Sequence, residues 1–166
     1  MRYTIRDGRP DDWAAARALR LEMLRNSPHA FGDRLEDVTA WDDERWRVRS
    51  SSMTMPDSAW AVAVSDDGRF LGQMAGRDYF GEAWLLEVYV APGARGSGAA
   101  GRLLAEIEAW AAARGHRRLY LDVSERSTAA RRFYARSGFV ETGKFSPHPL
   151  FPSESEIEMV KQLTDN

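Results

Sequence analysis

The sequence predicts an α+β fold in which helices cover both faces of one mixed, mostly antiparallel sheet. Two patterns lead to this fold class. Strand patterns joined by a tight turn come first and predict hairpins, and strand–helix–strand patterns come later and predict a parallel pair. With 166 residues, 43% of them hydrophobic, the chain has the size and composition of one domain, so we expect residues 1–166 to form a single domain.

The N-terminal part is predicted to contain a short strand and a first helix. Residues 3–6 alternate polar and apolar side chains, which is typical of a strand. A helix is predicted from Pro10 to about Arg25, because proline suits the first helical position and acidic residues follow it in the first turn. Its apolar side is expected to consist of Trp13, Ala14, Leu21 and Leu24.

A second helix is predicted over residues 39–51, with Trp41 and Trp46 as its buried anchors. The acidic run 42–44 has two interpretations: it attracts an amine, or it is the solvated first turn of this helix. The serines at 50–52 are expected to begin a flexible link to the next strand.

Hairpin strands are predicted in the middle of the chain. Residues 60–64 and 70–76 have strand composition, and Asp66-Asp67-Gly68 between them is a typical hairpin turn. Residues 79–81 are predicted to turn the chain into a central strand over residues 85–90.

The C-terminal half is predicted to alternate helices and strands, with glycine as the helix stop. The expected elements are a helix that ends near Gly115, a strand over 119–123, a helix over 128–136 that ends at Gly138, and closing strands over 139–142 and 156–160.

The stretch 85–104 combines a strand, a glycine-rich turn and a helix. Pro92 and Gly93 end the strand, and Gly96, Ser97 and Gly98 precede the helix. The helix carries an apolar stripe at a spacing of about 3.6 residues, formed by Ala100, Leu103, Leu104, Ile107, Trp110 and Ala111. Unpaired N–H groups at a helix start bind anions, so the turn is either a phosphate site or a tight connection that binds nothing.

Two nucleotide motifs fit the turn poorly. No Lys-Ser or Lys-Thr follows the glycines, so a nucleoside-triphosphate P-loop is unsupported. Residues 96–101 match G-x-G-x-x-G, and Asp122 lies at a suitable distance for a dinucleotide fold. However, residues 91–95 separate these glycines from the strand, whereas the dinucleotide fingerprint turns immediately after it.

Residues 95–100, RGSGAA, resemble the coenzyme A signature [QR]-x-x-G-x-[GA] of the GNAT acetyltransferase superfamily, and a strand ending in VYVAP precedes them. A second motif follows about thirty residues later, with Ala130, Tyr134 and Gly138-Phe139 matching A-x-x-x-Y and the following G-F of that family. The resemblance covers about residues 1–162 and is strong over 84–141.

The resemblance implies the three-layer α/β/α fold of this family, with a central strand pair that splays apart. It also implies acetyl-CoA as the acetyl donor. Backbone N–H groups of residues 95–100 would hold its diphosphate, and free backbone groups of the central strand would pair with its pantetheine amides and acetyl oxygen. The implied donor-binding residues are Val88, Tyr89, Val90, Arg95, Gly96, Ser97, Gly98, Ala99, Ala100, Ser127 and Tyr134.

The resemblance assigns Tyr134 as the acid that protonates the departing sulfur, since a neutral phenol carries a proton at neutral pH. The alternative is that Tyr134 only packs beside Phe133. Ser127 stands where many family members have asparagine, and it can cap the helix and bond a cofactor oxygen.

Two carboxylates are candidates for the general base. Glu87 and Asp122 each interrupt an apolar strand, which usually indicates a function or an ion pair. Glu87 is expected nearest the thioester and the acceptor, whereas Asp122 stands where the ribosomal-protein acetyltransferases of the family carry a glutamate base. In the loop 28–32, Phe31 either contacts the acceptor, as in a subgroup of the family, or fills the core below the loop.

The amino-acid composition excludes several kinds of site and partner. There is no cysteine, which excludes disulfides, thiolate metal sites and an acetyl thioester on the enzyme, and the three histidines lack ligand spacing, so we expect no metal. A net charge of −2 gives no footprint for nucleic acid or an anionic membrane and is compatible with a cationic amine. Without a signal-peptide pattern or an apolar run of roughly 20 residues, a cytoplasmic location is expected.

The function predicted from these features is acetyl transfer from acetyl-CoA to the primary amine of a small molecule, by direct attack in a ternary complex. The loops 27–33 and 144–153 are expected to select the acceptor, and the resemblance implies a homodimer. The alternatives are a protein N-terminal or lysine acetyltransferase and a non-catalytic sensor that binds coenzyme A.

Overall fold

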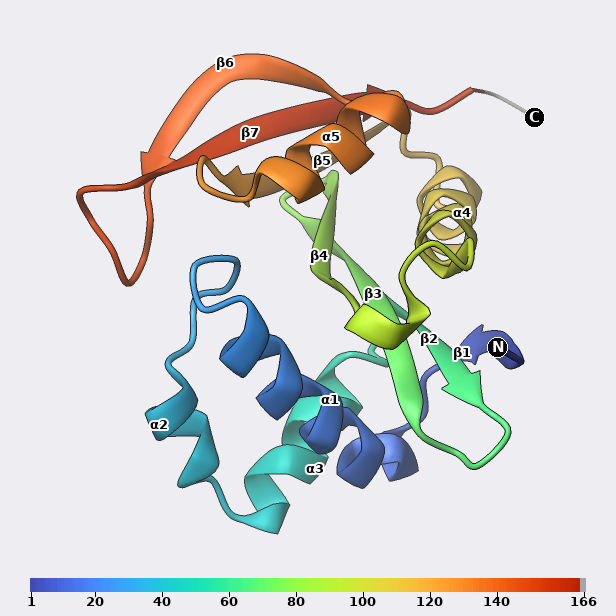
Figure 1. The fold of residues 1–166 in the computed structure, drawn as a ribbon. Coiled ribbons are helices and arrows are strands. Elements are labelled where there is room, and N and C mark those ends of the chain that lie inside the picture. Colours follow the sequence, from blue (N-terminus) through green and yellow to red (C-terminus); the bar gives the residue numbers. More distant parts are fainter. Residues whose placement is uncertain (165–166) are drawn as a thin grey trace.

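The computed structural model of the protein describes residues 1–164, and in it one seven-stranded sheet has the order β1-β2-β3-β4-β5-β7-β6 (Figure 1). Neighbouring strands are antiparallel except β4 and β5, which are parallel. This confirms the predicted mixed, mostly antiparallel sheet. The strands are β1 (Tyr3–Asp7), β2 (Ser58–Ser65), β3 (Phe70–Tyr79), β4 (Glu82–Val90), β5 (Arg118–Ser124), β6 (Val140–Pro147) and β7 (Ser155–Gln162).

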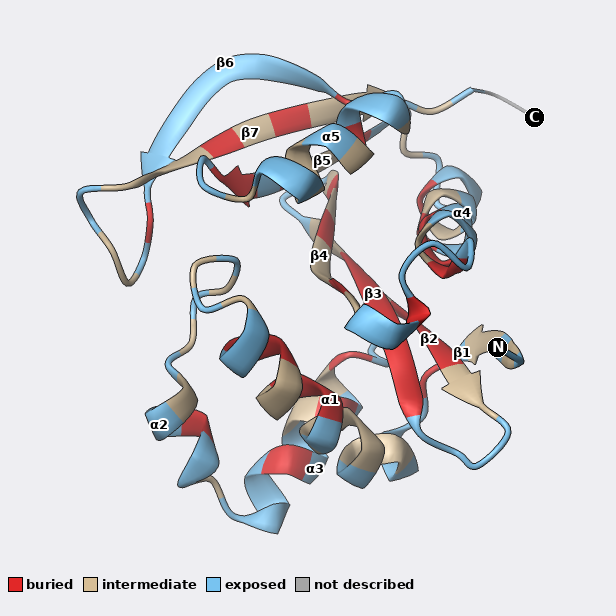
Figure 2. Cartoon of the chain, viewed as in Figure 1, coloured by how far each residue is buried: buried red, intermediate tan, exposed pale blue. Residues whose placement is uncertain are grey.

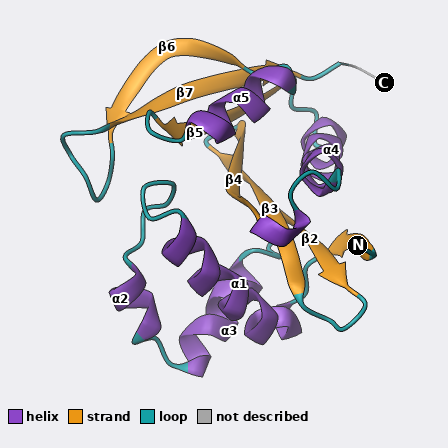
Figure 3. Cartoon of the chain, in the orientation of Figure 1, coloured by secondary structure: helices purple, strands orange, loops and turns teal. Residues whose placement is uncertain are grey.

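Helices cover both faces of the sheet, as Figures 1 and 3 show. On one face lie α1 (Trp13–Asn26), α2 (Leu35–Thr39) and α3 (Asp43–Ser52), and on the other lie α4 (Ala99–Ala113) and α5 (Thr128–Arg136). Short 3-10 turns, η1 (Pro10–Asp12) and η2 (Pro92–Ala94), precede α1 and the glycine-rich loop. None of these helices is long and apolar enough to span a lipid bilayer within residues 1–164.

The sheet separates two apolar cores. The core under α4 and α5 contains Leu85, Leu103, Ile107 and Leu121, and the core under α1 contains Met23 and Trp60, among others. The buried residues in Figure 2 concentrate on β3 and on the inner sides of α1 and α4, whereas β6 is exposed along its whole length. The predicted stripe of α4 faces this core: Leu103, Leu104, Ile107 and Ala111 are buried, and Ala100 and Trp110 are partly buried against it. Ala99, which was not expected, is buried as well.

The predicted splay of the central strands is present. Strands β4 and β5 pair only at Ala83↔Leu119 and Trp84↔Tyr120, near the start of each strand. Beyond this point the two strands diverge. In contrast, β4 pairs with β3 along almost its whole length, with a bulge that places Glu87 and Val88 opposite Met74.

Two predictions in the N-terminal half were wrong, and a third was wrong in part. A single helix over 39–51 was expected, but a separate short helix, α2, precedes α3, which begins at Asp43. The serines at 50–52 belong to α3 rather than to a flexible link, and Ser50 is buried beneath the helix. The apolar side of α1 was predicted in part: Leu24 is buried and Trp13 and Leu21 pack against the same cluster, but Ala14 is exposed. The buried positions Leu19, Arg20 and Met23 were not expected.

The acidic run at the start of α3 is the helix cap. The Asp42 carboxylate accepts a hydrogen bond from the Arg45 backbone N–H at 2.8 Å, and Asp43 pairs with Arg17 at 3.4 Å. The side chains of Arg17 and Asp43 are both exposed at the surface. The structure therefore supports the interpretation as a solvated first turn.

Candidate active site

The glycine-rich loop before α4 presents unpaired backbone donors. Gly96 and Gly98 adopt φ values of 76° and 85°, which side chains with a Cβ disfavour. Within residues 1–164, no protein group accepts a hydrogen bond from the N–H of Gly96, Gly98, Ala100 or Gly101. These donors lie at the positive end of a 15-residue helix, an arrangement that suits a phosphate group.

Side chains near the loop fix its shape. The Tyr3 hydroxyl of β1 donates to the Ser97 carbonyl at 3.0 Å, and the Ser97 hydroxyl donates to the Ala94 carbonyl at 2.6 Å. Arg95 Nε donates to the Val90 carbonyl at 3.1 Å, so this carbonyl points away from β3 and toward the loop. The contact of Tyr3 could not be predicted from the sequence, because no local pattern links β1 to a residue 94 positions away.

The end of β4 presents different side chains to the two cores. Val88 and Val90 pack at the edge of the α4-side core, whereas Tyr89 is buried toward α1. The Tyr89 hydroxyl donates to Glu22 and accepts from Asn26, each at 2.9 Å. Tyr89 can therefore contribute to a donor site only through its backbone.

Glu87 lies in an ion-pair network on the α1 side of the sheet. One carboxylate oxygen is 3.0 Å from Arg20 and accepts from Gln73 at 3.3 Å, and the other is 2.8 Å from Arg49. Arg20 also pairs with Asp33 at 2.7 Å. Desolvation opposes ionisation, but the two guanidinium groups outweigh it and hold the pKa of Glu87 below its usual range.

Asp122 has the opposite environment. It is exposed on the side of the sheet that Glu87 also faces, directly across from Glu158 of β7 and close to Glu156. Partial desolvation and repulsion from these two carboxylates raise the pKa of Asp122 to about 6. A carboxylate of this pKa is ionised at neutral pH and is a better proton acceptor than an ordinary aspartate.

Tyr134 lies on the inner side of α5 and is 5% exposed. It packs between Phe133 and Phe139, with ring centroids 5.6 and 5.7 Å away, and within residues 1–164 its hydroxyl has no hydrogen-bond partner. Burial raises the pKa of Tyr134, so the phenol stays neutral and can donate a proton or a hydrogen bond. Ser127 occupies the N-cap position of α5, but its side chain makes no capping hydrogen bond, which corrects the expected cap.

The two loops predicted to select the acceptor touch each other. His148 is buried, and its Nε2 lies 2.9 Å from the His29 carbonyl oxygen. The His29 ring stacks on Phe151 at 4.3 Å, and its Nδ1 lies 3.0 Å from Glu154. Phe31, in the first loop, is partly buried against the core under α1 and against a smaller cluster of Leu24, Val38 and Trp46, which supports its core-filling interpretation. Its contact with an acceptor stays a prediction.

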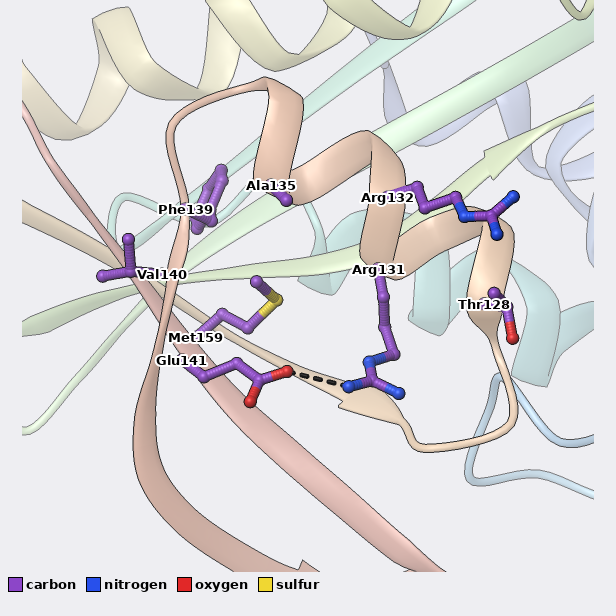
Figure 4. Close-up of a pocket in the computed structure, with 8 residues that line it drawn as sticks. All are labelled: Thr128, Arg131, Arg132, Ala135, Phe139, Val140, Glu141 and Met159. Atoms are coloured by element: carbon purple, nitrogen blue, oxygen red, sulfur yellow. Dashed lines mark hydrogen bonds and ion pairs between the residues drawn. The ribbon is translucent and has the colours of Figure 1, made fainter.

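A shallow pocket of about 440 Å³ lies on the other side of α5, away from Tyr134. Figure 4 shows the Arg131–Glu141 ion pair of 2.9 Å across this pocket, which Arg132 and Thr128 also line. Its apolar floor includes Phe139 and Met159. None of the predicted site residues lines it, so we do not assign it to the reaction. Within residues 1–164, no group of three histidine or acidic side chains is arranged to hold a metal ion.

A family model described as the acetyltransferase (GNAT) family matches residues 17–139. The chain belongs to the GNAT acetyltransferase family. An uncharacterized N-acetyltransferase of Mycobacterium tuberculosis is 35% identical over 103 residues, which cover 61% of this chain and 66% of that relative. The match thus spans slightly less than two thirds of the length of the relative.

Solved GNAT structures share the fold. A GCN5-related N-acetyltransferase from Kribbella flavida superposes with a TM-score of 0.74 at 26% identity, over 97% of this chain and 98% of that chain. The putative acetyltransferase yncA from Salmonella typhimurium, solved with acetyl-CoA, has a TM-score of 0.78 at 18% identity, over 100% of this chain and 96% of that chain. The family and fold expected from the two motifs are therefore confirmed, and the family is one of acyltransferases.

The environment of Asp122 generates a prediction. By NMR titration its carboxyl group should have a pKa of about 6. Glu158→Gln removes a like charge and should lower that pKa, whereas Glu141→Gln, at a carboxylate already paired with Arg131, should leave it unchanged. An Asp122 pKa near 4 in the wild type, or an unchanged pKa in Glu158→Gln, would contradict this assignment.

Proposed function

We propose that this protein transfers an acetyl group from acetyl-CoA to the primary amine of a small molecule, by direct attack in a ternary complex. The observation that carries the proposal is the set of unpaired N–H groups at Gly96, Gly98, Ala100 and Gly101, next to a strand that leaves its parallel neighbour after Trp84. Membership of the GNAT family supports it. The yncA protein, which has the same fold, was solved with acetyl-CoA.

The donor is assigned to the loop and to the end of β4. The unpaired N–H groups hold the diphosphate of the donor, and backbone groups of residues 88–90 hold the pantetheine arm of the donor. The Val90 carbonyl already accepts one hydrogen bond from Arg95 and has a second lone pair for an amide of the donor. Bound acetyl-CoA would supply the thioester acetyl group, and Ser127 lies at the start of α5 as a further polar contact.

Proton transfer is assigned to Asp122 and Tyr134. Asp122, with its raised pKa, accepts a proton from the acceptor ammonium, directly or through water. Tyr134 keeps its proton at all physiological pH values and donates to the sulfur as negative charge develops there. Because cysteine is absent, no thioester on the enzyme can carry the acetyl group between donor and acceptor.

The acceptor is assigned to the face of the sheet that carries Asp122. Glu156 and Glu158 on β7 add negative charge to this face, which favours an ammonium group. A protein N-terminus or lysine remains the alternative acceptor. The homodimer and the cytoplasmic location expected from the sequence stay predictions.

The proposed function is tested by release of free thiol from acetyl-CoA across a panel of small amines, peptides with free N-termini, and lysine-containing peptides. Small primary amines should release the thiol at the highest rates and without an acetylated enzyme intermediate. A protein that binds acetyl-CoA and releases no thiol with any amine is a sensor. Preferential turnover of peptides would assign it to protein acetylation.

The roles of the loop and of Tyr134 generate separate predictions. Gly98→Val adds a Cβ at φ 85° where the donor approaches, and it should weaken acetyl-CoA binding by about 2 kcal/mol. Tyr134→Phe removes only a proton donor, so turnover should fall by about 10²-fold with almost unchanged acetyl-CoA affinity. Calorimetric titration and steady-state rates distinguish the two effects.

Gly115→Val is the control for Gly98→Val, because Gly115 has φ 84° with no atom near its missing Cβ and lies at the other end of α4. It should reduce stability and leave affinity intact. Normal acetyl-CoA binding by folded Gly98→Val would refute the loop assignment. A fully active Tyr134→Phe would transfer the acid role to water or another residue.

A further inference from the structure

The bulge in β4 changes which face of the sheet the following side chains occupy. Leu85 packs in the α4-side core and Leu86 in the α1-side core. Simple alternation would send residue 87 into the α4-side core, but Glu87 stays on the α1 side with its arginine partners. Val88 then faces α4 and Tyr89 faces α1. The extra residue therefore sets the direction of the strand end that leads into the glycine-rich loop.

Glu87 is held in this position against an unfavourable backbone conformation. Its φ of 57° lies in the left-handed region that non-glycine residues disfavour. Such a conformation persists only where the surroundings over-determine it. Here the surroundings are charged, because both carboxylate oxygens contact a guanidinium group, one from Arg20 and one from Arg49. An ionised carboxylate would also be costly in the apolar core on the other face.

Arg20 connects this bulge to the loop after α1. Its side chain is only 5% exposed and lies between Glu87 at 3.0 Å and Asp33 at 2.7 Å. The guanidinium group also lies 5.0 Å from the ring centroid of Phe31. A buried guanidinium that is paired with two carboxylates is held from both sides, so Arg20 ties the bulge at Glu87 to the loop that carries Asp33.

We propose that Glu87 and Arg20 are positioning residues: their ion pair fixes the β4 bulge and so orients residues 88–90 toward the donor. This inference rests on the proposed function, since the donor site is the one assigned there. It also separates the two carboxylates that the sequence left as alternatives. Each oxygen of Glu87 already contacts a guanidinium, so acceptance of a further proton would cost an ion pair, and Asp122 remains as the proton acceptor.

The test compares acetyl-CoA affinity in Glu87→Gln, Arg20→Met and the double variant by calorimetric titration. Each single substitution should raise Kd by about tenfold. The double variant should lose less affinity than the two single losses combined, because both substitutions break the Arg20–Glu87 pair. Arg20→Lys retains the charge and should recover part of the affinity, which keeps the test usable if Arg20→Met unfolds.

Arg17→Met is the matched control. Arg17 lies on the same helix and pairs with Asp43 near the surface. Its substitution should leave acetyl-CoA affinity unchanged.

A second readout needs no ligand. In the free protein, the backbone amide of Tyr89, which pairs with Gln73 of β3, should exchange with solvent hydrogen faster in Glu87→Gln than in the wild type, because the anchor of the bulge is lost. Wild-type exchange rates and wild-type Kd in Glu87→Gln would overturn the inference. If turnover of Glu87→Gln also fell by about 10²-fold, Glu87 would be the proton acceptor instead of a positioning residue. Failure of the wild type to bind acetyl-CoA would instead remove the proposed function, and the exchange rates would still decide whether Glu87 anchors the bulge.

Discussion

The short parallel pairing between β4 and β5 is the constraint on which the rest of the site depends. Two residue pairs join these strands, and beyond Trp84 and Tyr120 each follows its antiparallel neighbour. The sheet thus remains continuous at one end, where the Trp84 and Tyr120 rings stack at 5.3 Å, and is divided at the other. Backbone groups that would be consumed in a complete ladder are left for a ligand, and the helix α4 begins close to where β4 ends.

Neighbouring charges on the divided part of the sheet shift the pKa values of two carboxylates in opposite directions. Glu87 has cationic neighbours, which lower its pKa, and Asp122 has anionic neighbours and partial desolvation, which raise its pKa. Pairs of acids whose environments separate their pKa values usually have different roles. We assign a structural role to Glu87, which stays ionised, and proton transfer to Asp122, whose pKa is raised.

The sequence predicted the parts of the molecule that local pattern determines. The α4 stripe, the hairpin turn at Gly68 and the helix stop at Gly115 depend on spacing and on glycine conformation, and all three are present. The helix α2 was missed because five residues are too few for a periodic signal. The ion pair between Arg20 and Glu87 was missed because an arginine in a helix ordinarily predicts a solvent-facing position, and its partner is 67 residues away. Pattern likewise cannot show a bulge at a glutamate, because the bulge is determined by tertiary contacts.

The most direct test of the central claim is amide hydrogen exchange, measured by NMR with and without saturating acetyl-CoA. The N–H groups of Gly96, Gly98, Ala100 and Gly101 have no acceptor among the described residues, so they should exchange rapidly in the free protein. Acetyl-CoA should slow all four, because a phosphate would accept their hydrogen bonds. Saturation that leaves these four amides unprotected would show that the donor binds elsewhere and would contradict the assignment of the site.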